Sequence, residues 1–298
     1  MAIRVIVNPS SGRGRAGGLV PQIQQTLAEI GQAAAIDVAR DGPDLAAAVR
    51  RARDLGDERV IVVGGDGTIH LAVQELAGAD TAMGLVPAGT GDDNARMLGV
   101  PRGDVRAATI LAATGAIDRV DLGRVATADG TERVFLGVMS SGFDSLVNER
   151  ANRMTWPKGD ARYLAAIVGE LRTFRPVSYT ADIDGREVHG DAMLVAIGNG
   201  ASYGGGMRVC PDADPADGLL EVTWLHGVGT LTFLRVFPRV FSGKHVTSGH
   251  VSTVRARRIS LNAPNQIVYA DGEYVGPLPA TVDVLPGALA VARGRVCA

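Results

Sequence analysis

Short β-branched runs alternate with helical segments through residues 1–122 of the chain. Strands are predicted at 3–7, 36–39, 60–63 and 82–86. Apolar residues at helical spacing predict helices at 19–30, 44–55 and 68–77. Asp44 is the expected N-cap of the second helix. Strands that alternate with helices in this way predict a parallel sheet covered by helices on both faces.

The pattern changes after Asp121-Leu122-Gly123, where turn pairs become frequent. Short β-rich runs follow at 134–138, 179–183, 194–197, 219–224, 259–261 and 281–284. One helical segment, 163–174, interrupts them. This spacing is typical of an antiparallel β-sandwich or barrel. We therefore predict an α/β domain at 1–122 and a β-sandwich domain at 123–298, whose last few residues can return to the first domain.

Composition excludes several classes of protein. The 298 residues include 30 Lys and Arg against 32 Asp and Glu, a formal net charge of -2, so a globally basic nucleic-acid-binding protein is excluded. Cys210 and Cys297 form no C-x-x-C pair, so we expect a reducing cytoplasm. No apolar run of about 20 residues is present, so we expect a soluble protein.

The motif Gly64-Gly65-Asp66-Gly67-Thr68 follows a predicted strand and opens a predicted helix. Its glycines let the backbone approach a ligand, and the helix N-terminus offers N–H groups suited to phosphate. The Asp66 carboxylate would repel phosphate unless Mg²⁺ lay between them. The motif predicts a phosphate and metal site, although alone it also fits an ordinary strand-to-helix turn.

Two further loops have the same design. Gly89, Thr90 and Asp93 follow the fourth predicted strand, and the loop 8–14 follows the first. The carboxyl ends of neighbouring parallel strands border one crevice, so three such loops favour a nucleotide site over an isolated turn. Asp92, beside Asp93, is more typical of a helix N-cap than of a ligand.

The scarcity of lysine narrows the chemistry. Lys158 and Lys244 are the only lysines, and neither stands in a Walker A loop or on a strand after a glycine loop. A P-loop enzyme and a protein kinase are therefore excluded. Backbone N–H groups, Mg²⁺ and arginine must instead neutralise a transferred phosphoryl group.

The motif at 64–68 is similar to one shared by diacylglycerol, sphingosine and NAD kinases and phosphofructokinases. The whole ordered set resembles the bacterial diacylglycerol kinase-like lipid kinases. Its members are Asn8-Pro9-x-Ser11-Gly12, Pro87–Gly99, Asp121-Leu122-Gly123, Gly198-Asn199-Gly200, Tyr203–Gly206, Pro211-x-Ala213, Asp217-Gly218-x-Leu220 and Asp271-Gly272-Glu273. The resemblance runs from residue 8 to residue 273.

This resemblance implies an ATP- and Mg²⁺-dependent enzyme. Asp66 and Asp93 would hold the catalytic Mg²⁺ through water, with Asp121 completing the network, and Glu273 would be the general base for the lipid hydroxyl. The implied nucleotide-binding residues are Asn8, Pro9, Ser11, Gly64, Gly65, Asp66, Gly67, Thr68, Gly89 and Thr90.

The resemblance also implies a structural Mg²⁺ held by the Asp217 carboxylate and the backbone carbonyls of Asp214 and Leu219. The residues alone leave simpler explanations open: an acidic turn at 212–217, and a hairpin turn with an exposed Glu273. The sequence departs from the family pattern at His70-Leu71, where many relatives have Asn-Glu. An isolated histidine such as His70 is more typical of a structural residue.

No acidic residue lies between Glu221 and Asp271. The cations of that stretch are Arg235, Arg239, Lys244, Arg255, Arg257 and Arg258. They could bind an anionic membrane, at about 1 kcal/mol per cation, or pair with acids elsewhere in the fold. The helix at 163–174 could line the lipid entrance or pack in the core.

The sequence therefore predicts a cytoplasmic lipid kinase at the inner face of the membrane, with diacylglycerol as the default acceptor and phosphatidic acid as its product. A sphingoid base, phosphatidylglycerol or another lipid alcohol fits the same motifs. A kinase of a soluble substrate such as NAD and a non-catalytic nucleotide-binding regulator are the rivals. No nucleic acid partner is expected, and a homodimer is compatible with the sequence.

Overall fold

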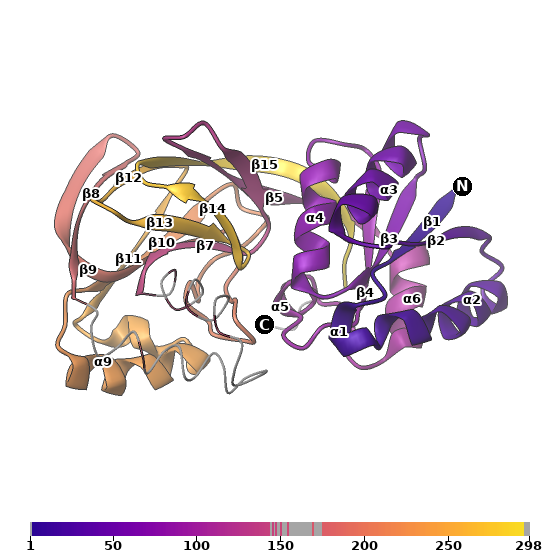
Figure 1. The fold of residues 1–298 in the computed structure, drawn as a ribbon, viewed down its shortest axis with the longest axis horizontal. Coiled ribbons are helices and arrows are strands. Elements are labelled where there is room, and N and C mark those ends of the chain that lie inside the picture. The colour runs from indigo at the N-terminus through magenta and orange to yellow at the C-terminus, as the bar shows by residue number, and fades with distance from the viewer. Residues whose placement is uncertain are drawn as a thin grey trace.

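The computed structural model describes residues 2–143 and 175–294, with residues 145, 147, 150, 154 and 169 between these ranges. The predicted helix at 163–174 lies outside the described residues except for Gly169. An α/β domain and a strand-rich domain lie side by side, and β15 runs from one into the other (Figure 1).

The α/β domain is built on a parallel sheet in the order β4-β3-β1-β2. Its strands are β1 (Ile3–Val7), β2 (Ala34–Val38), β3 (Arg59–Gly64) and β4 (Ala82–Pro87). Its helices are α1 (Ser11–Gly14), η1 (Ala16–Leu19), α2 (Val20–Glu29), α3 (Gly42–Asp54), α4 (Asp66–Leu76), α5 (Asp93–Met97) and α6 (Val105–Thr114). All six residues of β3 are buried, as expected of a central strand that is covered on both faces.

The helices pack in pairs, α3 with α4 and α2 with α6. One predicted detail is wrong. Asp41, not Asp44, caps α3, because the Asp41 Oδ1 atom accepts the backbone N–H of Asp44 at 2.8 Å. Asp44 lies in the first turn, where its negative charge is favourable at a helix N-terminus.

Antiparallel strands dominate the second domain. They are β5 (Ile117–Thr127), β6 (Glu132–Phe135), β7 (Val138–Gly142), β8 (Val177–Ile183), β9 (Arg186–Gly198), β10 (Leu220–His226), β11 (Val251–Ala256), β12 (Arg258–Asn262), β13 (Ile267–Ala270), β14 (Glu273–Pro277) and β15 (Ala280–Ala292). Three short helical segments, α9 (Thr230–Val236), η2 (Phe237–Ser242) and η3 (Lys244–Thr247), lie at one end of the sandwich (Figure 1). The predicted fold class, an α/β domain followed by an antiparallel sandwich, is confirmed.

The last strand belongs to both domains. β15 pairs antiparallel with β5 from Ala280 to Ala292, and Val291 also pairs parallel with Met83 of β4. The β15–β5 register shifts between Leu285 and Leu289. The ladder bends there, so β5 and β15 carry a hydrogen-bonded connection across the domain boundary.

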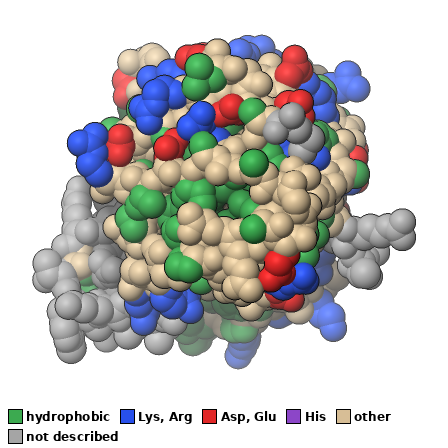
Figure 2. Space-filling view, turned by 90° about the vertical axis from the view of Figure 1, so that its right-hand side faces the viewer, with side chains coloured by type: hydrophobic (Ala, Val, Ile, Leu, Met, Phe, Trp, Pro, Cys, Tyr) green, Lys and Arg blue, Asp and Glu red, His purple; other side chains and the backbone are tan. Residues whose placement is uncertain are grey.

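Each domain has its own apolar core. The first core is built from β1, β3, β4 and the facing helices, and it includes Leu289 and Val291 of β15. The second lies inside the sandwich around Tyr179 and Trp224, whose rings meet edge to face at 5.9 Å. On the end of the molecule formed by the α/β domain, Lys and Arg side chains are interspersed with Asp and Glu (Figure 2), in keeping with a near-neutral net charge.

The Glu221 carboxyl is buried on the face of β10 opposite the sandwich core. Its Oε2 atom accepts the Asp212 N–H at 2.8 Å, whereas its Oε1 atom has no hydrogen-bond partner among the described residues. Burial raises the pKa of Glu221 to about 7. The folded protein therefore binds this proton more tightly than the unfolded chain does, and the free energy of unfolding falls as pH rises through the range between the two pKa values.

We predict that Glu221→Gln removes this pH dependence. Because each pKa unit is worth about 1.4 kcal/mol, the variant should be more stable than the parent by up to about 3 kcal/mol at pH 8, and nearly equal to it at pH 5. Urea unfolding at both pH values measures the difference. An equal difference at the two pH values would contradict the raised pKa.

Candidate functional site

Three loops meet at the carboxyl ends of β1, β3 and β4. The Asn8 Nδ2 group donates to Thr68 Oγ1 at 2.9 Å, and the Ser11 hydroxyl lies 3.0 Å from the same atom. The loops of β3 and β4 touch at glycines: a Cβ on Gly65 would lie 3.0 Å from the Gly89 Cα atom. Only residues without side chains allow this approach, so the Gly65 and Gly89 backbones form one wall.

Asp66 lies at the first turn of α4 and reaches the start of α5. Its carboxylate accepts the backbone N–H groups of Asp93 at 3.2 Å and Asn94 at 3.0 Å. Burial raises the pKa of Asp66, and the negative charges of Asp93 and Asp92 raise it further. A cation bound here would relieve that repulsion.

Asp92 occupies the N-cap position of α5, but its side chain does not cap the helix. The residue has φ +49°, and its Oδ1 atom accepts the Gly89 N–H at 2.9 Å. The carboxylate therefore fixes the loop that follows β4.

The Asp93 side chain connects the α/β domain to the sandwich domain. Its Oδ2 atom accepts the Gly205 N–H at 2.6 Å, the Ser202 hydroxyl donates to Oδ1 at 3.3 Å, and Arg96 forms an ion pair with it. The carboxylate thus draws the glycine-rich loop at 203–206 against the start of α5.

Two cavities open along these loops. The larger, about 880 Å³, is lined by Arg13, Arg15, Asp66, Thr90, Asp93 and Gly205, among others. The second, about 520 Å³, is lined by Asn8, Ser11, Gly67, Thr68, Arg133 and Glu273, among others. Of the predicted nucleotide residues, Asp66 and Thr90 line the larger cavity, and Asn8, Ser11, Gly65, Gly67 and Thr68 line the second. Successive residues of the loop 65–68 and of the turn 271–273 border the one cavity or the other, so the two are called together the crevice. Pro9, Gly64 and Gly89 belong to its loops without being among the described lining residues.

Glu273 follows the tight turn at Asp271-Gly272, between β13 and β14. Its Oε1 atom would lie 3.5 Å from a Cβ on Gly67, so the carboxylate faces the N-terminal turn of α4. Glu273 thus stands beside a hairpin turn and also lines the second cavity, and its role as a general base stays a prediction.

Asp271 has a role that the sequence reasoning missed. Its carboxylate accepts the backbone N–H groups of Leu136, Gly137 and Val138 at 3.0, 2.9 and 3.2 Å, and it is only 2% exposed. His70 Nδ1 of α4 lies 3.4 Å from Asp271 Oδ2, so the histidine contacts the far domain. The Asp271-Gly272 pair, which is typical of a turn, was the available sequence signal, but nothing local identifies the partners of its carboxylate.

Asp121 lies on β5, the strand that joins the domains. Its two carboxylate oxygens accept the Gly218 N–H and the Gly287 N–H, both at 2.7 Å. These bonds hold the loop before β10 and the bend in β15. The residue thus fixes the domain connection, and none of its described hydrogen bonds reaches the carboxylates of Asp66 and Asp93.

At the predicted structural metal site, the Asp217 carboxylate forms an ion pair with Arg255 and accepts the Leu219 N–H at 3.0 Å. Asp214 accepts the Ala216 N–H at 3.1 Å. These contacts describe an acidic turn, and the described residues hold no group of three metal-ligating side chains. The structural Mg²⁺ stays a prediction.

The crevice residues nevertheless fit a hydrated Mg²⁺. Asp66 and Asp93 supply carboxylates, and burial beside like charges makes the Asp66 position favourable for a cation. Mg²⁺ in kinases commonly keeps several waters and takes one or two carboxylates plus substrate phosphates. The donor set suits that arrangement better than a closed cage of protein ligands.

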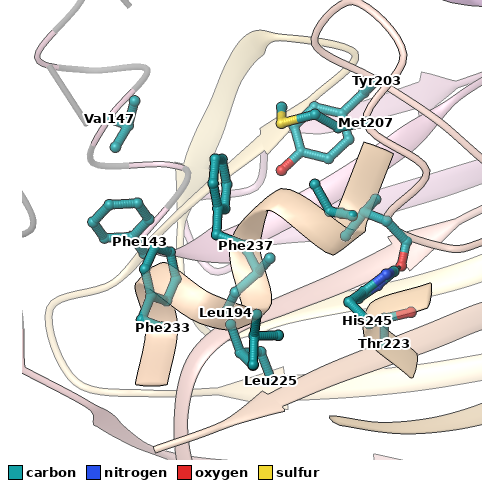
Figure 3. Close-up of a pocket in the computed structure, with 13 residues that line it drawn as sticks. Phe143, Val147, Leu194, Tyr203, Met207, Thr223, Leu225, Phe233, Phe237 and His245 are labelled. Atoms are coloured by element: carbon teal, nitrogen blue, oxygen red, sulfur yellow. The ribbon is translucent and has the colours of Figure 1, made fainter. Parts of the chain in front are cut away.

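An apolar cavity of about 50 Å³ lies between the sandwich and the segment formed by α9, η2 and η3. Phe143 and Phe233 meet at one side of it and His245 lies beside Thr223 at another (Figure 3). His245 Nε2 lies 3.1 Å from the Val209 carbonyl, and its Nδ1 atom has no partner among the described residues. Burial lowers the pKa of His245, so the ring stays neutral and Nδ1 is free to accept a hydrogen bond.

Tyr203 lines both this apolar cavity and the larger part of the crevice. A hydrocarbon chain and a polar phosphate donor could therefore lie on the two sides of one side chain. That arrangement is the one expected of a two-domain kinase whose acceptor is an amphiphile.

Comparison with known proteins agrees with this class. Residues 2–125 match the diacylglycerol kinase catalytic domain, and residues 137–293 match the YegS C-terminal NAD kinase beta sandwich-like domain. The chain belongs to the diacylglycerol kinase-like family of lipid kinases, as the sequence motifs predicted.

Individual relatives cover nearly the whole chain. A diacylglycerol kinase of Mycobacterium tuberculosis is 40% identical, over 98% of this chain and 95% of its own. A protein of Salmonella paratyphi A, "Probable lipid kinase YegS", is 31% identical over 81% of this chain and 80% of its own. A solved diacylglycerol kinase structure from Bacillus anthracis shares the fold with a TM-score of 0.75 at 20% identity, covering 100% of this chain and 98% of that one.

We predict that Asp271→Ala destabilises the protein by about 3 kcal/mol, because three buried N–H groups lose their acceptor. Asp271→Asn should cost less, since its carbonyl oxygen still accepts from Gly137 and Val138. Chemical denaturation measures both. Asn265→Ala is the matched control: Asn265 has φ +57° at an exposed position, and its side chain forms no hydrogen bond with a described residue, so that variant reports backbone strain alone. Equal losses of unfolding free energy at the two positions would show that the Asp271 carboxylate does not stabilise the fold through these hydrogen bonds.

Proposed function

We propose that this protein transfers the γ-phosphate of ATP to the hydroxyl group of diacylglycerol, giving phosphatidic acid and ADP. The observation that carries the proposal is the shared wall at Tyr203, with the glycine-rich crevice on one side and an apolar cavity on the other. The names of the relatives support diacylglycerol over other lipid alcohols.

In this proposal the loops of β1, β3 and β4 bind the nucleotide phosphates. The N–H groups at the start of α4 and the Asn8, Ser11 and Thr68 side chains supply hydrogen bonds. Arg13 and Arg15, which line the larger cavity, add positive charge where lysine is lacking. Asp66 and Asp93 would hold a hydrated Mg²⁺, which neutralises charge on the transferred phosphoryl group.

Glu273 would act on the acceptor. Its carboxylate takes the proton from the lipid hydroxyl while that oxygen forms a bond to the γ-phosphorus, and the bond from phosphorus to the ADP oxygen breaks. Asp271 positions the turn that carries Glu273, since three backbone N–H groups and His70 fix its carboxylate. The residues of the nucleotide loops and the base then face each other across one crevice.

The acceptor's hydrocarbon would contact the apolar side chains that line this cavity. Such a cavity favours a lipid over a soluble acceptor such as NAD. Since ATP is supplied in the cytoplasm, we place the reaction at the inner face of the membrane. None of the described helices is long and apolar enough to cross a bilayer, so contact with lipid would be peripheral.

The decisive measurement is transfer of labelled phosphate from ATP with Mg²⁺ to acceptors in mixed micelles. The panel contains diacylglycerol, a sphingoid base, phosphatidylglycerol and NAD. We expect diacylglycerol to be preferred, and Glu273→Gln to lower kcat at least about a hundredfold, because the proton acceptor is lost. Glu187→Gln, at an exposed position near the start of β9, is the matched control.

Other outcomes discriminate the rival functions. Preference for another lipid would identify that lipid, and not diacylglycerol, as the acceptor of a lipid kinase. Transfer to NAD alone would show that the acceptor is a soluble molecule. ATP binding without transfer to any acceptor would support a nucleotide-binding regulator. Full activity of Glu273→Gln would contradict the general-base role.

The apolar cavity can be tested separately. Val240→Trp places a large ring in the cavity, so we expect the KM for diacylglycerol to rise at least about tenfold while the KM for ATP is unchanged. Val254→Trp, at a 43% exposed position of β11, is the control. An unchanged lipid KM in the folded Val240→Trp variant would show that the acceptor lies elsewhere.

A further inference from the structure

The segment formed by α9, η2 and η3 has two different faces. Its inner face contributes Phe233, Val236, Phe237 and Val240 to the apolar cavity. Its outer face presents Leu231 at 74%, Leu234 at 49% and Phe241 at 55% exposure. Three large hydrophobic side chains are thus open to solvent on the same short segment that walls the cavity.

Cations accompany these exposed apolar side chains. Arg235, Arg239 and Lys244 are all exposed on this segment. Neither Arg235 nor Lys244 forms an ion pair with any described residue, and Arg239 donates a hydrogen bond to the Thr247 hydroxyl. No acidic residue occurs between 222 and 270 to balance them.

Two of the other three cations of the acid-free stretch are paired. Arg255 pairs with Asp217 and Arg258 pairs with Asp283, whereas Arg257 forms no ion pair with a described residue. The two explanations of the basic stretch therefore apply to different parts of it: Arg255 and Arg258 neutralise acids of the sandwich, and the helical cations face outward.

We propose that this outer face, defined by Leu231, Leu234, Arg235, Phe241 and Lys244, docks on an anionic lipid bilayer. Exposed apolar side chains beside unpaired cations are the composition that binds a charged membrane interface, where the apolar groups enter and the cations meet lipid headgroups. The proposal rests on the proposed function, because docking here brings the wall of the apolar cavity to the surface that supplies the acceptor.

A second copy of the chain is the alternative occupant. Two such faces would bring like charges together with no acid on the segment to offset them. Anionic lipid offers the opposite charge, so charge complementarity selects the bilayer.

Co-sedimentation with vesicles tests the surface. We expect the protein to bind vesicles of phosphatidylcholine with 30% phosphatidylglycerol at least about tenfold more tightly than pure phosphatidylcholine, and high salt to weaken that binding. Arg235→Glu with Lys244→Glu, and separately Leu231→Ser with Phe241→Ser, should each lower the affinity at least about tenfold. Arg51→Glu with Leu55→Ser is the matched control, since Leu55 is 71% exposed on the other domain.

The outcomes separate this proposal from the proposed function. Phosphate transfer to a dispersed short-chain diacylglycerol is measured for every variant, and the docking variants should keep the parental rate. Docking variants that bind vesicles as tightly as the parent does would overturn the proposal. Light scattering that shows a dimer of the parent, lost in docking variants that still bind vesicles, would also overturn it and assign the face to a second copy of the chain. Vesicle binding that follows the prediction while no protein transfers phosphate would leave the docking surface standing and overturn the kinase assignment.

Discussion

Buried aspartates that accept backbone N–H groups are the constraint on which the crevice depends. Asp66 fixes the start of α5, Asp93 holds Gly205 of the other domain, Asp271 holds residues 136–138, and Asp121 holds Gly218 and Gly287. Each carboxylate brings together chain segments that lie far apart in the sequence. Aspartates therefore hold segments of the two domains together, and two of them, Asp66 and Asp93, are also the proposed Mg²⁺ ligands.

Much of this arrangement could be predicted from local sequence. Strand and helix order in the first domain follows from periodicity, and the three glycine-rich loops meet because parallel strands end at one edge of a sheet. The β-rich half was recognisable from its turns. The motif order then identified the family and the candidate roles of Asp66, Asp93 and Glu273, which the structure places along one crevice.

The rest depended on contacts between distant residues. The backbone partners of Asp271 are about 135 positions away, and those of Asp121 lie in the loop before β10 and in β15. The helix predicted to begin at Asp44 begins at Gly42, because Asp41 is the residue with extended backbone that can cap it. The basic stretch divided into paired and unpaired cations only once the strands at 251–262 had neighbours from other segments.

The shared strand β15 has a consequence for how the chain reaches its native state. Leu289 and Val291 belong to the core of the first domain, although the strands β5 to β14 separate them from β4 in the chain. The parallel sheet therefore lacks its neighbour to β4 until the whole sandwich has been synthesised, and closing it requires a loop that spans that domain. A truncation that removes only the final strand would leave the edge of β4 exposed, a site for pairing with other unfinished chains.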